Sequence, residues 1–392
     1  MKKIILGITV LALMGSCRSG QKGDLPGARE LAETLDPLRE QAVKHRKIPR
    51  TIDEAGQVKW TGERYDWTEG FWPGVCWILF DQTGDEKWKE EAVASQEQFV
   101  AHKDLTTDHD LGFIFNCSYG KAYQITKEDR YKEVMLDAAS SLVTRFNEKT
   151  GCIQSWDVGD NWQGKRGWEF PVIIDNLMNL ELLFEASELT GDPRYADIAV
   201  KHANTTMKNH FREDASSYHV VDYDPLTGKI RSRETAQGYA DESAWARGQA
   251  WALYGYTMCY RYTRDKAYLE MAERISGFII SHPNYPDDGV PYWDFDAPDI
   301  PEAPRDASAA AIMASAWIEL SEYSEGDYLQ RAHTVLETLS SDRFRNRRGE
   351  GYFLLRHSVG SIPHGNEIDV PLVYADYYYL EALERMKKIS GE

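Results

Sequence analysis

The sequence predicts an all-α protein, an (α/α)6 toroid in which an inner ring of helices is surrounded by an outer ring. Strongly apolar helices alternate along the chain with helices that have a single apolar stripe, and we expect the former at the centre and the latter around them. A polar turn that ends in an aromatic residue recurs before the striped helices. The spacing of these aromatic residues fits one helical hairpin plus a loop; they are Trp88, Tyr131, Tyr195, Tyr268 and Tyr328.

The chain begins with MKKIILGITVLALMGSC, in which two lysines precede an apolar stretch too short to span a membrane and small residues precede Cys17. This pattern predicts a lipoprotein signal peptide over residues 1–16, with the lipid on Cys17; an ordinary signal peptide cut elsewhere is the alternative. We expect a flexible tether over 17–30 and a single toroid domain over 31–392. The expected location is the periplasm or the cell surface, with the lipid as the only membrane attachment.

The inner helices are expected where the sequence is apolar or aromatic on nearly every side. The helices that follow the turns, such as YADIAVKHANTTMKNH at 195–210, have one apolar stripe and belong to the outer ring. In chain order, the predicted inner segments are GVCWILFDQ, FIFNCSYGKAYQI, NLMNLELLFEASEL, WALYGYTMCYRY, AAAIMASAWIELSEY and PLVYADYYYLEALERM.

The charge of the chain limits its partners. The formal net charge is −18 and no basic cluster occurs after the first residues, which argues against a nucleic-acid partner. An anionic ligand would have to be small and locally paired. We expect a monomer. The four cysteines beyond Cys17 are widely spaced and form no CxxC pair, so their spacing predicts neither a disulfide framework nor a zinc site.

A toroid of this kind collects the segments that precede its inner helices at one end. The unusual residues of the chain lie in those segments or at the starts of the inner helices, so we expect them to meet in one cavity. The segments are YDWTEGFWPG, DHDLGF, FPVIIDN, QGYADESAWARGQAW, PYWDFDAP with PRDASAA, and HSVGSIPHGNEID.

One of these segments, PVIIDNLMNL at 171–180, places Asp175 inside an apolar run. A buried carboxylate is costly unless it has a use or a partner. Desolvation should raise its pKa toward neutrality, which suits a general acid. The structural alternative is an aspartate that caps a neighbouring helix or bonds to Asn179, one turn further on.

Together these motifs resemble those of the unsaturated glucuronyl hydrolases, glycoside hydrolase family 88. The matching pieces run in order from about residue 60 to about residue 385. They are WTEGFW, HDLGF, IIDNLMNL, SYHVVDYDP, QGYADESAWARGQAW, YWDFD with RDASAAA, and YADYYYLEAL.

The resemblance implies an enzyme that removes a 4,5-unsaturated uronic acid from the non-reducing end of oligosaccharides left by polysaccharide lyases. The reaction in this family is hydration of a vinyl ether, in which one carboxyl serves as acid and then as base. By resemblance Asp175 is that carboxyl, and Asp110 is the supporting one that orients sugar hydroxyls and tunes Asp175. Asp110 could instead be the N-cap of the helix that follows it.

The resemblance also implies residues that bind the substrate. Arg247 is expected to hold the substrate carboxylate with its bidentate guanidinium, or else to pair with Asp241 or Glu242. His219 and Gln237 are expected to donate to sugar hydroxyls or to the attacking water.

Tryptophans offer flat faces on which a pyranose ring can stack. Trp67, Trp72, Trp251 and Trp293 are candidates, and Trp67 is preferred because it lies in a loop and matches the family's platform tryptophan. Any one of them could instead be a core residue.

We expect no metal and no cofactor. The sequence DHD at 108–110 is the one candidate cluster, but on a helix its three side chains could not all face one ion. The sugar that is released is left open. Ser358, Ser361, His364 and Asn366 could contact it, a glycosaminoglycan disaccharide is the preferred substrate, and a plant or bacterial polysaccharide fragment is the alternative.

Other classes of function were weighed against this one. An unsaturated rhamnogalacturonyl hydrolase would share the fold and act on pectin fragments. A glycan-binding lipoprotein would have no reason to embed Asp175 in an apolar helix. A sugar epimerase on the same toroid would be expected to have paired histidines at its cavity.

Overall fold

The structure is a computed structural model that describes residues 25–62 and 64–391. The predicted signal peptide over 1–16 and the predicted lipidation site at Cys17 lie outside the described residues. Helix α1 (Ala28–His45) begins within the segment that was predicted as a tether over 17–30. No helix of the described part of the chain is long and apolar enough to cross a bilayer.

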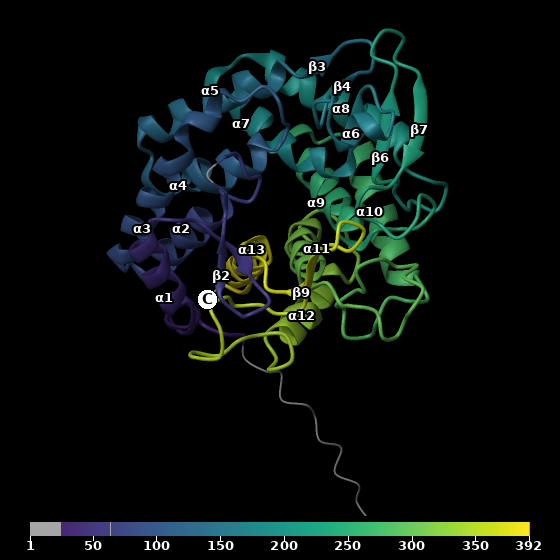
Figure 1. The fold of residues 1–392 in the computed structure, drawn as a ribbon. Helices are drawn as coiled ribbons and strands as arrows, with labels where there is room; N and C mark the ends of the chain where they lie inside the picture. Colours follow the sequence, from purple (N-terminus) through teal and green to yellow (C-terminus); the bar gives the residue numbers. More distant parts are fainter. Residues whose placement is uncertain (1–24, 63, 392) are drawn as a thin grey trace, which may run out of the picture.

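The helices form two concentric rings, and the predicted (α/α)6 toroid is confirmed (Figure 1). Each outer helix is followed along the chain by an inner one. The outer ring consists of α1, α3 (Glu86–Gln96) with the 3-10 segment η1 (Glu97–Asp104), α5 (Asp129–Val143), α8 (Pro193–Asn209), α10 (Lys266–Ser281) and α12 (Tyr328–Leu339). The inner ring consists of α2 (Phe71–Thr83), the π-helical segment η2 (Gly112–Gly120) with α4 (Lys121–Thr126), the 3-10 segment η3 (Ile174–Asn179) with α7 (Leu180–Thr190), α9 (Ala246–Thr263), α11 (Ala307–Leu320) and α13 (Val373–Ser390).

The inner ring is closed by contacts between successive helices. In chain order α2 contacts η2, η2 contacts α7, α7 contacts α9 and α9 contacts α11, while α13 contacts both α11 and α2. Every residue of α11 is buried, as expected for a helix that is apolar on all sides. The predicted alternation of inner and outer helices therefore holds around the whole ring.

The recurring turns place helix caps where the sequence has aspartate. The side chains of Asp85, Asp192 and Asp265 each accept a hydrogen bond from a backbone N–H in the first turn of α3, α8 and α10. An aromatic residue in the first turn of these helices is then buried, for example Trp88 and Tyr268. The turns thus fix both the start of each outer helix and its anchor in the core.

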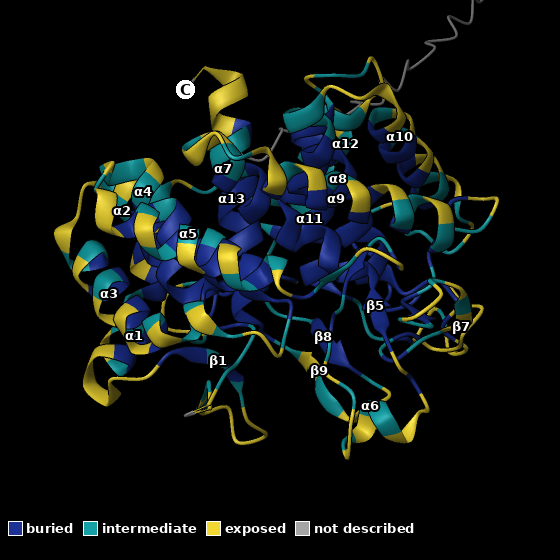
Figure 2. Ribbon diagram, turned by 90° about the horizontal axis from the view of Figure 1, so that it is seen from above, coloured by how far each residue is buried: buried dark blue, intermediate teal, exposed yellow. Residues whose placement is uncertain are grey.

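Short antiparallel strands lie at one end of the toroid, and the C-terminus lies at the other (Figure 2). In the three-stranded sheet, Pro171 pairs with Asp222 and Ile173 with Val220, which leads the chain straight into η3. The other elements at this end are the short helix α6 (Trp162–Lys165) and three two-stranded antiparallel pairs, β1–β2, β3–β4 and β8–β9. The strands are β1 (Pro49–Ile52), β2 (Val58–Trp60), β3 (Phe146–Asn147), β4 (Cys152–Ile153), β5 (Pro171–Ile173), β6 (Val220–Tyr223), β7 (Ile230–Glu234), β8 (Ser358–Ser361) and β9 (Asn366–Val370).

Candidate active site

Asp175 lies at the strand-bearing end of the toroid, in the 3-10 turn between β5 and α7. The backbone N–H of the preceding residue, Ile174, donates to the carbonyl of His219 at 3.0 Å, which ties this turn to the end of the neighbouring strand. Asp175 is 9% exposed. The apolar residues that flank Asp175 in the sequence are buried around it in the structure, as the sequence predicts.

Burial raises the pKa of Asp175 to about 7, against the lowering effect of the Arg247 charge. Burial likewise raises the pKa of Asp110 to about 7, and the charge of Asp175 adds to that rise. The two carboxyls are therefore neighbours that hold protons near neutral pH. This is the protonation state that a general acid needs.

Asp110 lies two residues before η2 and is held by Asn179 at the end of η3, which neighbours η2 in the ring. The side-chain amide of Asn179 reaches Asp110 Oδ1 at 3.4 Å, and Asn179 Oδ1 accepts from the N–H of Phe113 at 3.0 Å. The cap of η2 is thus Asn179 and not Asp110. Close approach at Gly112 makes this possible, because a Cβ there would lie 2.4 Å from Asn179 Cα.

His219 is the third side chain of the site, and it lies next to Asp175. Its Nδ1 accepts hydrogen bonds from the N–H groups of Ala236 and Gln237, at 3.0 and 3.2 Å. Its Nε2 lies 3.6 Å from Asp175 Oδ2. Burial holds the pKa of His219 well below its ordinary value, so the ring is neutral and directs its single proton toward Asp175.

Arg247 is almost fully buried, and its terminal nitrogens are already engaged within the protein. Nη1 donates to the carbonyl of Val359 and lies 3.4 Å from Asp306 Oδ2; Nη2 donates to Gln237 Oε1 at 2.9 Å and to the carbonyl of Gly360 at 2.7 Å. The expected free bidentate guanidinium for a substrate carboxylate is therefore not what the structure shows. The alternative partners Asp241 and Glu242 are not used either. Arg247 lines the cavity and fixes Gln237 and β8.

The candidate tryptophans separate into a cavity group and a core group. Trp67 lines the cavity and packs on Tyr374 with ring centroids 5.0 Å apart. Trp72 is 1% exposed and donates to Glu91 on α3, so it faces the outer ring and not the substrate. Trp251 is fully buried, and its N–H acts on Asp175 from within the core, lowering that pKa. Trp293 is also buried.

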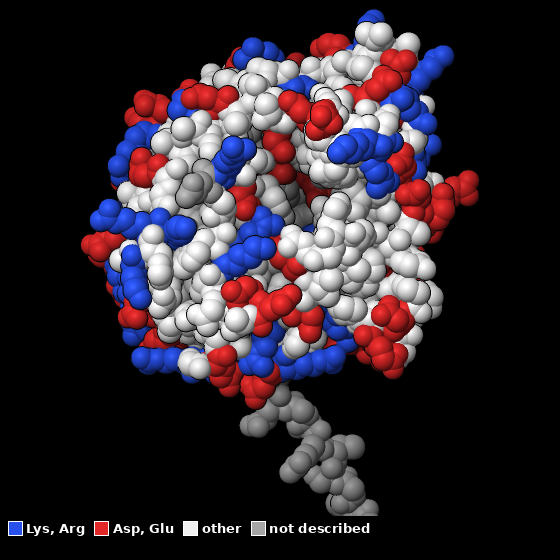
Figure 3. Space-filling model, viewed as in Figure 1, with Lys and Arg blue, Asp and Glu red and all other residues white. Residues whose placement is uncertain are grey.

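A cavity of about 230 Å³ opens beside these groups, within the hollow at the centre of the toroid (Figure 3). Of the two serines predicted to contact the substrate, Ser361 lines it, whereas Ser358 is buried in β8 and does not. Strand β8 alternates its side chains, which explains why only one of them faces the cavity. The lining residues are Arg50, Trp67, Trp162, Gln237, Arg247, Gly360, Ser361, His364, Asn366, Glu367 and Tyr374.

The DHD cluster differs from its expected geometry. Asp108, His109 and Asp110 offer one ligand atom each within 4.8 Å of one another, because they lie in the loop before η2 and not on a helix. The three side chains can therefore face one ion, contrary to the expectation for a helix. His109 Nε2 lies 3.3 Å from Asp110 Oδ1, and burial raises the pKa of Asp108 to about 7.

Several cavity residues were not identified from the sequence. Trp162 lies against Trp156 and Trp168, with ring centroids 5.3 and 5.6 Å apart, and Trp156 also approaches His219. Three tryptophans in a polar stretch were the available signal for this wall. For the pairing of Arg50 with Glu367, which are 317 positions apart, the sequence contains no local signal.

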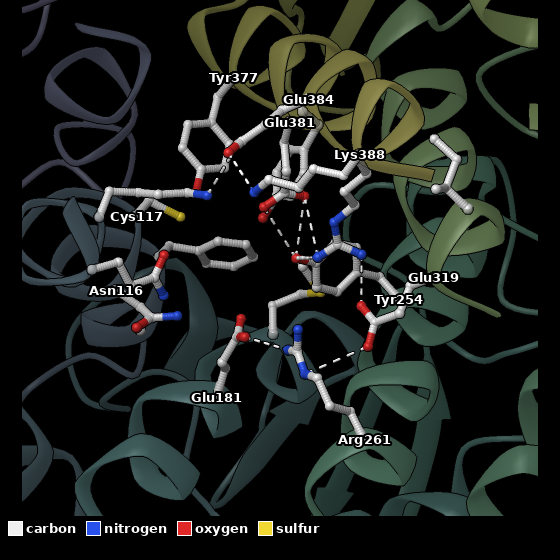
Figure 4. A pocket seen from close by; sticks show the side chains of 18 of the residues that line it. Asn116, Cys117, Glu181, Tyr254, Arg261, Glu319, Tyr377, Glu381, Glu384 and Lys388 are labelled. Atoms are coloured by element: carbon white, nitrogen blue, oxygen red, sulfur yellow. Dashed lines mark hydrogen bonds and ion pairs between the residues drawn. The ribbon is translucent and has the colours of Figure 1, made fainter. Parts of the chain in front are cut away.

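A second cavity, of about 260 Å³, lies between the inner helices (Figure 4). Its charged groups pair with one another: Arg261 with Glu181 and Glu319, and Arg385 with Glu319 and Glu381. Arg385 also donates to Tyr254, which bonds to Glu381. This closed set of ion pairs joins α7, α9, α11 and α13 and is a structural feature of the toroid.

Comparisons with known proteins agree with the geometry. The model of Glycosyl Hydrolase Family 88 matches residues 41–389. An unsaturated glucuronyl hydrolase of Formosa agariphila is 42% identical over 396 residues, which cover 98% of this chain and 97% of the relative. The crystal structure of an unsaturated glucuronyl hydrolase specific for heparin superposes with a TM-score of 0.88 at 46% identity, covering 93% and 97% of the two chains. That of the enzyme from Bacillus sp. GL1 has a TM-score of 0.84 at 34% identity, covering 92% and 96%.

Proposed function

The chain belongs to glycosyl hydrolase family 88, and we propose that it removes the 4,5-unsaturated uronic acid from the non-reducing end of lyase-generated oligosaccharides, with glycosaminoglycan disaccharides as the preferred substrates. The observation that supports this most directly is the buried carboxyl of Asp175. Its pKa of about 7, raised by burial, leaves a useful fraction of the carboxyl protonated near neutral pH, so it has a proton to donate. The substrates named for the solved relatives point to the same class.

The proposed reaction is hydration of the vinyl ether. Asp175 donates its proton to C4 of the unsaturated sugar, and the electron pair of the double bond forms the new C–H bond. Positive charge then develops at C5 and the ring oxygen. Water adds to C5 and gives a proton back to the Asp175 carboxylate, so one carboxyl acts first as acid and then as base.

The resulting hemiketal at C5 opens to a ketone and frees a hydroxyl at C1. That hemiacetal collapses to an aldehyde and releases the second sugar as an alcohol. The proton lent by Asp175 is regained, so the cycle consumes one water and no other reagent. The separation of two carboxylates, which predicts retention or inversion in direct displacement, has no bearing here.

The neighbouring groups have roles that follow from their contacts. His219 presents its Nε2 proton to Asp175 and stabilises the carboxylate that exists between the two proton transfers. Asp110 orients hydroxyls, and its own pKa is raised by burial and by the charge of Asp175. Gln237 is fixed by Arg247 at the cavity wall, where it can bond to a sugar hydroxyl.

The test follows the loss of ultraviolet absorbance by the C4–C5 double bond of unsaturated chondroitin and heparin disaccharides. Wild type should remove the absorbance and Asp175→Asn should not. Asp376→Asn is the matched control, since Asp376 is also buried with a pKa raised to about 7 but bonds only to the backbone of Leu354 and Leu355. If wild type bound a disaccharide and left its absorbance unchanged, the protein would be a glycan-binding lipoprotein instead.

Two further parts of the proposal concern the membrane anchor, which the N-terminal sequence supports, and the oligomeric state. Residues 1–16 act as a lipoprotein signal peptide, and a lipid on Cys17 attaches the mature protein to a membrane in the periplasm or at the cell surface. The toroid itself works as a monomer. Metabolic labelling with a fatty acid tests the anchor, with Cys17→Ser as the unlabelled control. Light scattering of the protein without its first 24 residues tests the monomer.

A further inference from the structure

Three consecutive residues beside Asp175, namely Asp108, His109 and Asp110, form a cluster of possible metal ligands. Each residue offers one ligand atom, and these atoms all lie within 4.8 Å of one another. The proposed reaction uses Asp110 alone of the three, so it does not explain why the other two side chains converge with it. The cluster lies in the loop before η2, where the sequence argument against a metal, which assumed a helix, does not apply.

Backbone contacts hold this loop in place. Asp108 forms an isolated antiparallel bridge with Trp156, and the N–H of His109 donates to the carbonyl of Ser155 at 3.2 Å. The N–H of Asp110 donates to Asp108 Oδ1 at 3.1 Å. Because the backbone that carries the three side chains is already fixed, an ion that binds them has little ordering of the chain to oppose it.

The imidazole of His109 is the observation that points to a ligand. His109 is fully buried, and its Nε2 has no hydrogen-bond partner among the described residues. This nitrogen lies 3.3 Å from Asp110 Oδ1. Two ligand atoms at about 2.0–2.1 Å from a tetrahedral zinc ion are themselves about 3.3 Å apart. The pair therefore already has the separation that one shared ion requires.

The His109 ring also has an acceptor for its proton. A metal-bound imidazole usually donates its other N–H to a neighbouring group. Asn176 is close enough to accept from His109, and its Oδ1 is buried and otherwise unpartnered in the part of the chain that the structure describes. Asn176 Nδ2 donates to the carbonyl of Ile153 at 2.9 Å, which fixes this amide. Asn179 Nδ2, at 3.5 Å from His109 Nδ1, has a nearer acceptor in Asp110 Oδ1 at 3.4 Å.

The two carboxyls of the cluster have no basic partner. Within the described ranges, no lysine or arginine nitrogen lies within 4 Å of a carboxylate oxygen of Asp108 or Asp110, and the one ring nitrogen that does belongs to His109. Buried charges in proteins are normally paired or bound to a metal ion. Asp108 is partly exposed, so an ion can reach the cluster from solvent.

We propose that Asp108, His109 and Asp110 bind one divalent transition-metal ion such as zinc, and that this ion inhibits the enzyme. An imidazole combined with carboxylates suits zinc, whereas magnesium and calcium prefer ligand sets of oxygen alone. The bound ion occupies the carboxyl of Asp110, which the substrate needs for its hydroxyl groups. The inhibition rests on the proposed function, but the binding of the ion does not.

Binding is measured without substrate. The protein is titrated with zinc chloride in phosphate-free buffer by calorimetry, and its melting temperature is recorded with and without the ion. We expect a site that raises the melting temperature of wild type, since the ion binds the folded state. His109→Gln and Asp108→Asn should each weaken binding by at least about tenfold. Asp108→Asn keeps the oxygen that accepts from Asp110, so it serves where His109→Gln folds poorly.

His357→Gln is the matched control for binding. His357 Nδ1 lies 2.7 Å from Asp369 Oδ1, but this exposed pair belongs to no group of three ligands among the residues described. The control should bind zinc as wild type does. No binding by wild type, or undiminished binding in the folded Asp108 and His109 variants, would overturn the site. Equally tight binding of magnesium or calcium would overturn the assignment to zinc.

Inhibition is measured by adding zinc chloride to the assay of double-bond absorbance. Zinc should raise the KM of wild type because the ion and the sugar compete for Asp110, and a chelator should restore the rate. Asp108→Asn should require at least about tenfold more zinc for the same fractional loss of its own rate. Binding of zinc without any loss of rate would overturn the inhibitory role. If wild type free of zinc hydrated no disaccharide, the proposed function would fail and the binding result would still stand.

Discussion

The Nε2 atom of His219 lies 3.6 Å from Oδ2 of Asp175, while Nδ1 of the same ring accepts from two backbone N–H groups. A ring nitrogen that accepts hydrogen bonds in this way carries no proton, so the proton is on Nε2 and faces the carboxyl. The backbone of the loop after β7 therefore decides the tautomer of a side chain in the active site. His219 turns its Nε2–H toward Asp175 across 3.6 Å, which is too long for a hydrogen bond, and both atoms lack a hydrogen-bond partner among the described residues.

Replacing His219 should slow the reaction more than it weakens binding. In His219→Gln the carboxylate of Asp175 loses a positioned donor, so kcat should fall by about 10²-fold with a smaller change in KM. His202→Gln is the matched control, since His202 is also buried and its Nδ1 also accepts from a backbone N–H, that of Ile153. That control should lower the melting temperature and leave kcat near the wild-type value. Equal losses of kcat in both variants would contradict the role of His219.

The pH dependence follows from the raised pKa of Asp175. The carboxyl must be protonated to act as acid, so kcat should be level below about pH 6 and fall about tenfold per pH unit above a pKa of about 7. Asp110→Asn removes a negative charge beside it and should move this fall to lower pH, because the interaction of the two carboxyls is reciprocal. Steady-state rates from pH 5 to about 9 would check both statements. A fall at the same pH in Asp110→Asn would show that the two groups are not coupled.

Trp67 and Trp72 should respond differently although they are close in sequence. Trp67→Ala removes a cavity wall and should raise KM about tenfold, and it should also lower the stability because the ring packs on Phe113 and Tyr374. Trp72→Phe deletes the N–H that bonds to Glu91 in the core, so the free energy of unfolding should fall by about 1–3 kcal/mol while KM is unchanged. Chemical denaturation and initial rates on each variant separate the two effects. A raised KM in Trp72→Phe would return that residue to the substrate site.

Gly112 should not tolerate a side chain. A Cβ there would lie 2.4 Å from Asn179 Cα, so Gly112→Ala must push Asp110 away from the turn that contains Asp175. We expect both kcat and the melting temperature to fall. Gly277→Ala on α10, where a Cβ meets nothing within 4 Å, should instead stabilise the protein by about 0.5–1 kcal/mol with unchanged kcat. Wild-type kcat in Gly112→Ala would mean that this close approach does not position the carboxyls.

Patterns within single elements were sufficient to predict much of the fold. The apolar run that became α11 indicated an inner helix, and all of its residues are buried. Asp175 was conspicuous because a carboxyl interrupts an apolar run, and burial is what raises its pKa. By contrast, the contact of Trp72 with Glu91 depends on how α2 and α3 pack, which the residues of either helix alone do not reveal.

The walls of the cavity depended on long-range pairing and were largely missed. Arg50 and Glu367 lie near opposite ends of the chain and meet only because the ring closes. The occupation of Arg247 by carbonyls of β8 was equally unpredictable, since backbone groups have no distinct sequence signature. Chemistry could be predicted from residue types, whereas the availability of each charged group required the assembled structure.

The position of α13 imposes an order on how the molecule is completed during synthesis. This helix ends the described chain, yet it packs between α11 and α2, which is the first inner helix. A chain that emerges from its N-terminus delivers α13 last. Until then α2 and α11 expose the apolar sides that α13 will cover. Glu367, the partner of Arg50, is synthesised only shortly before α13. The earlier hairpins can form as they appear, but the inner ring closes only when α13, the last helix of the toroid, packs between α11 and α2.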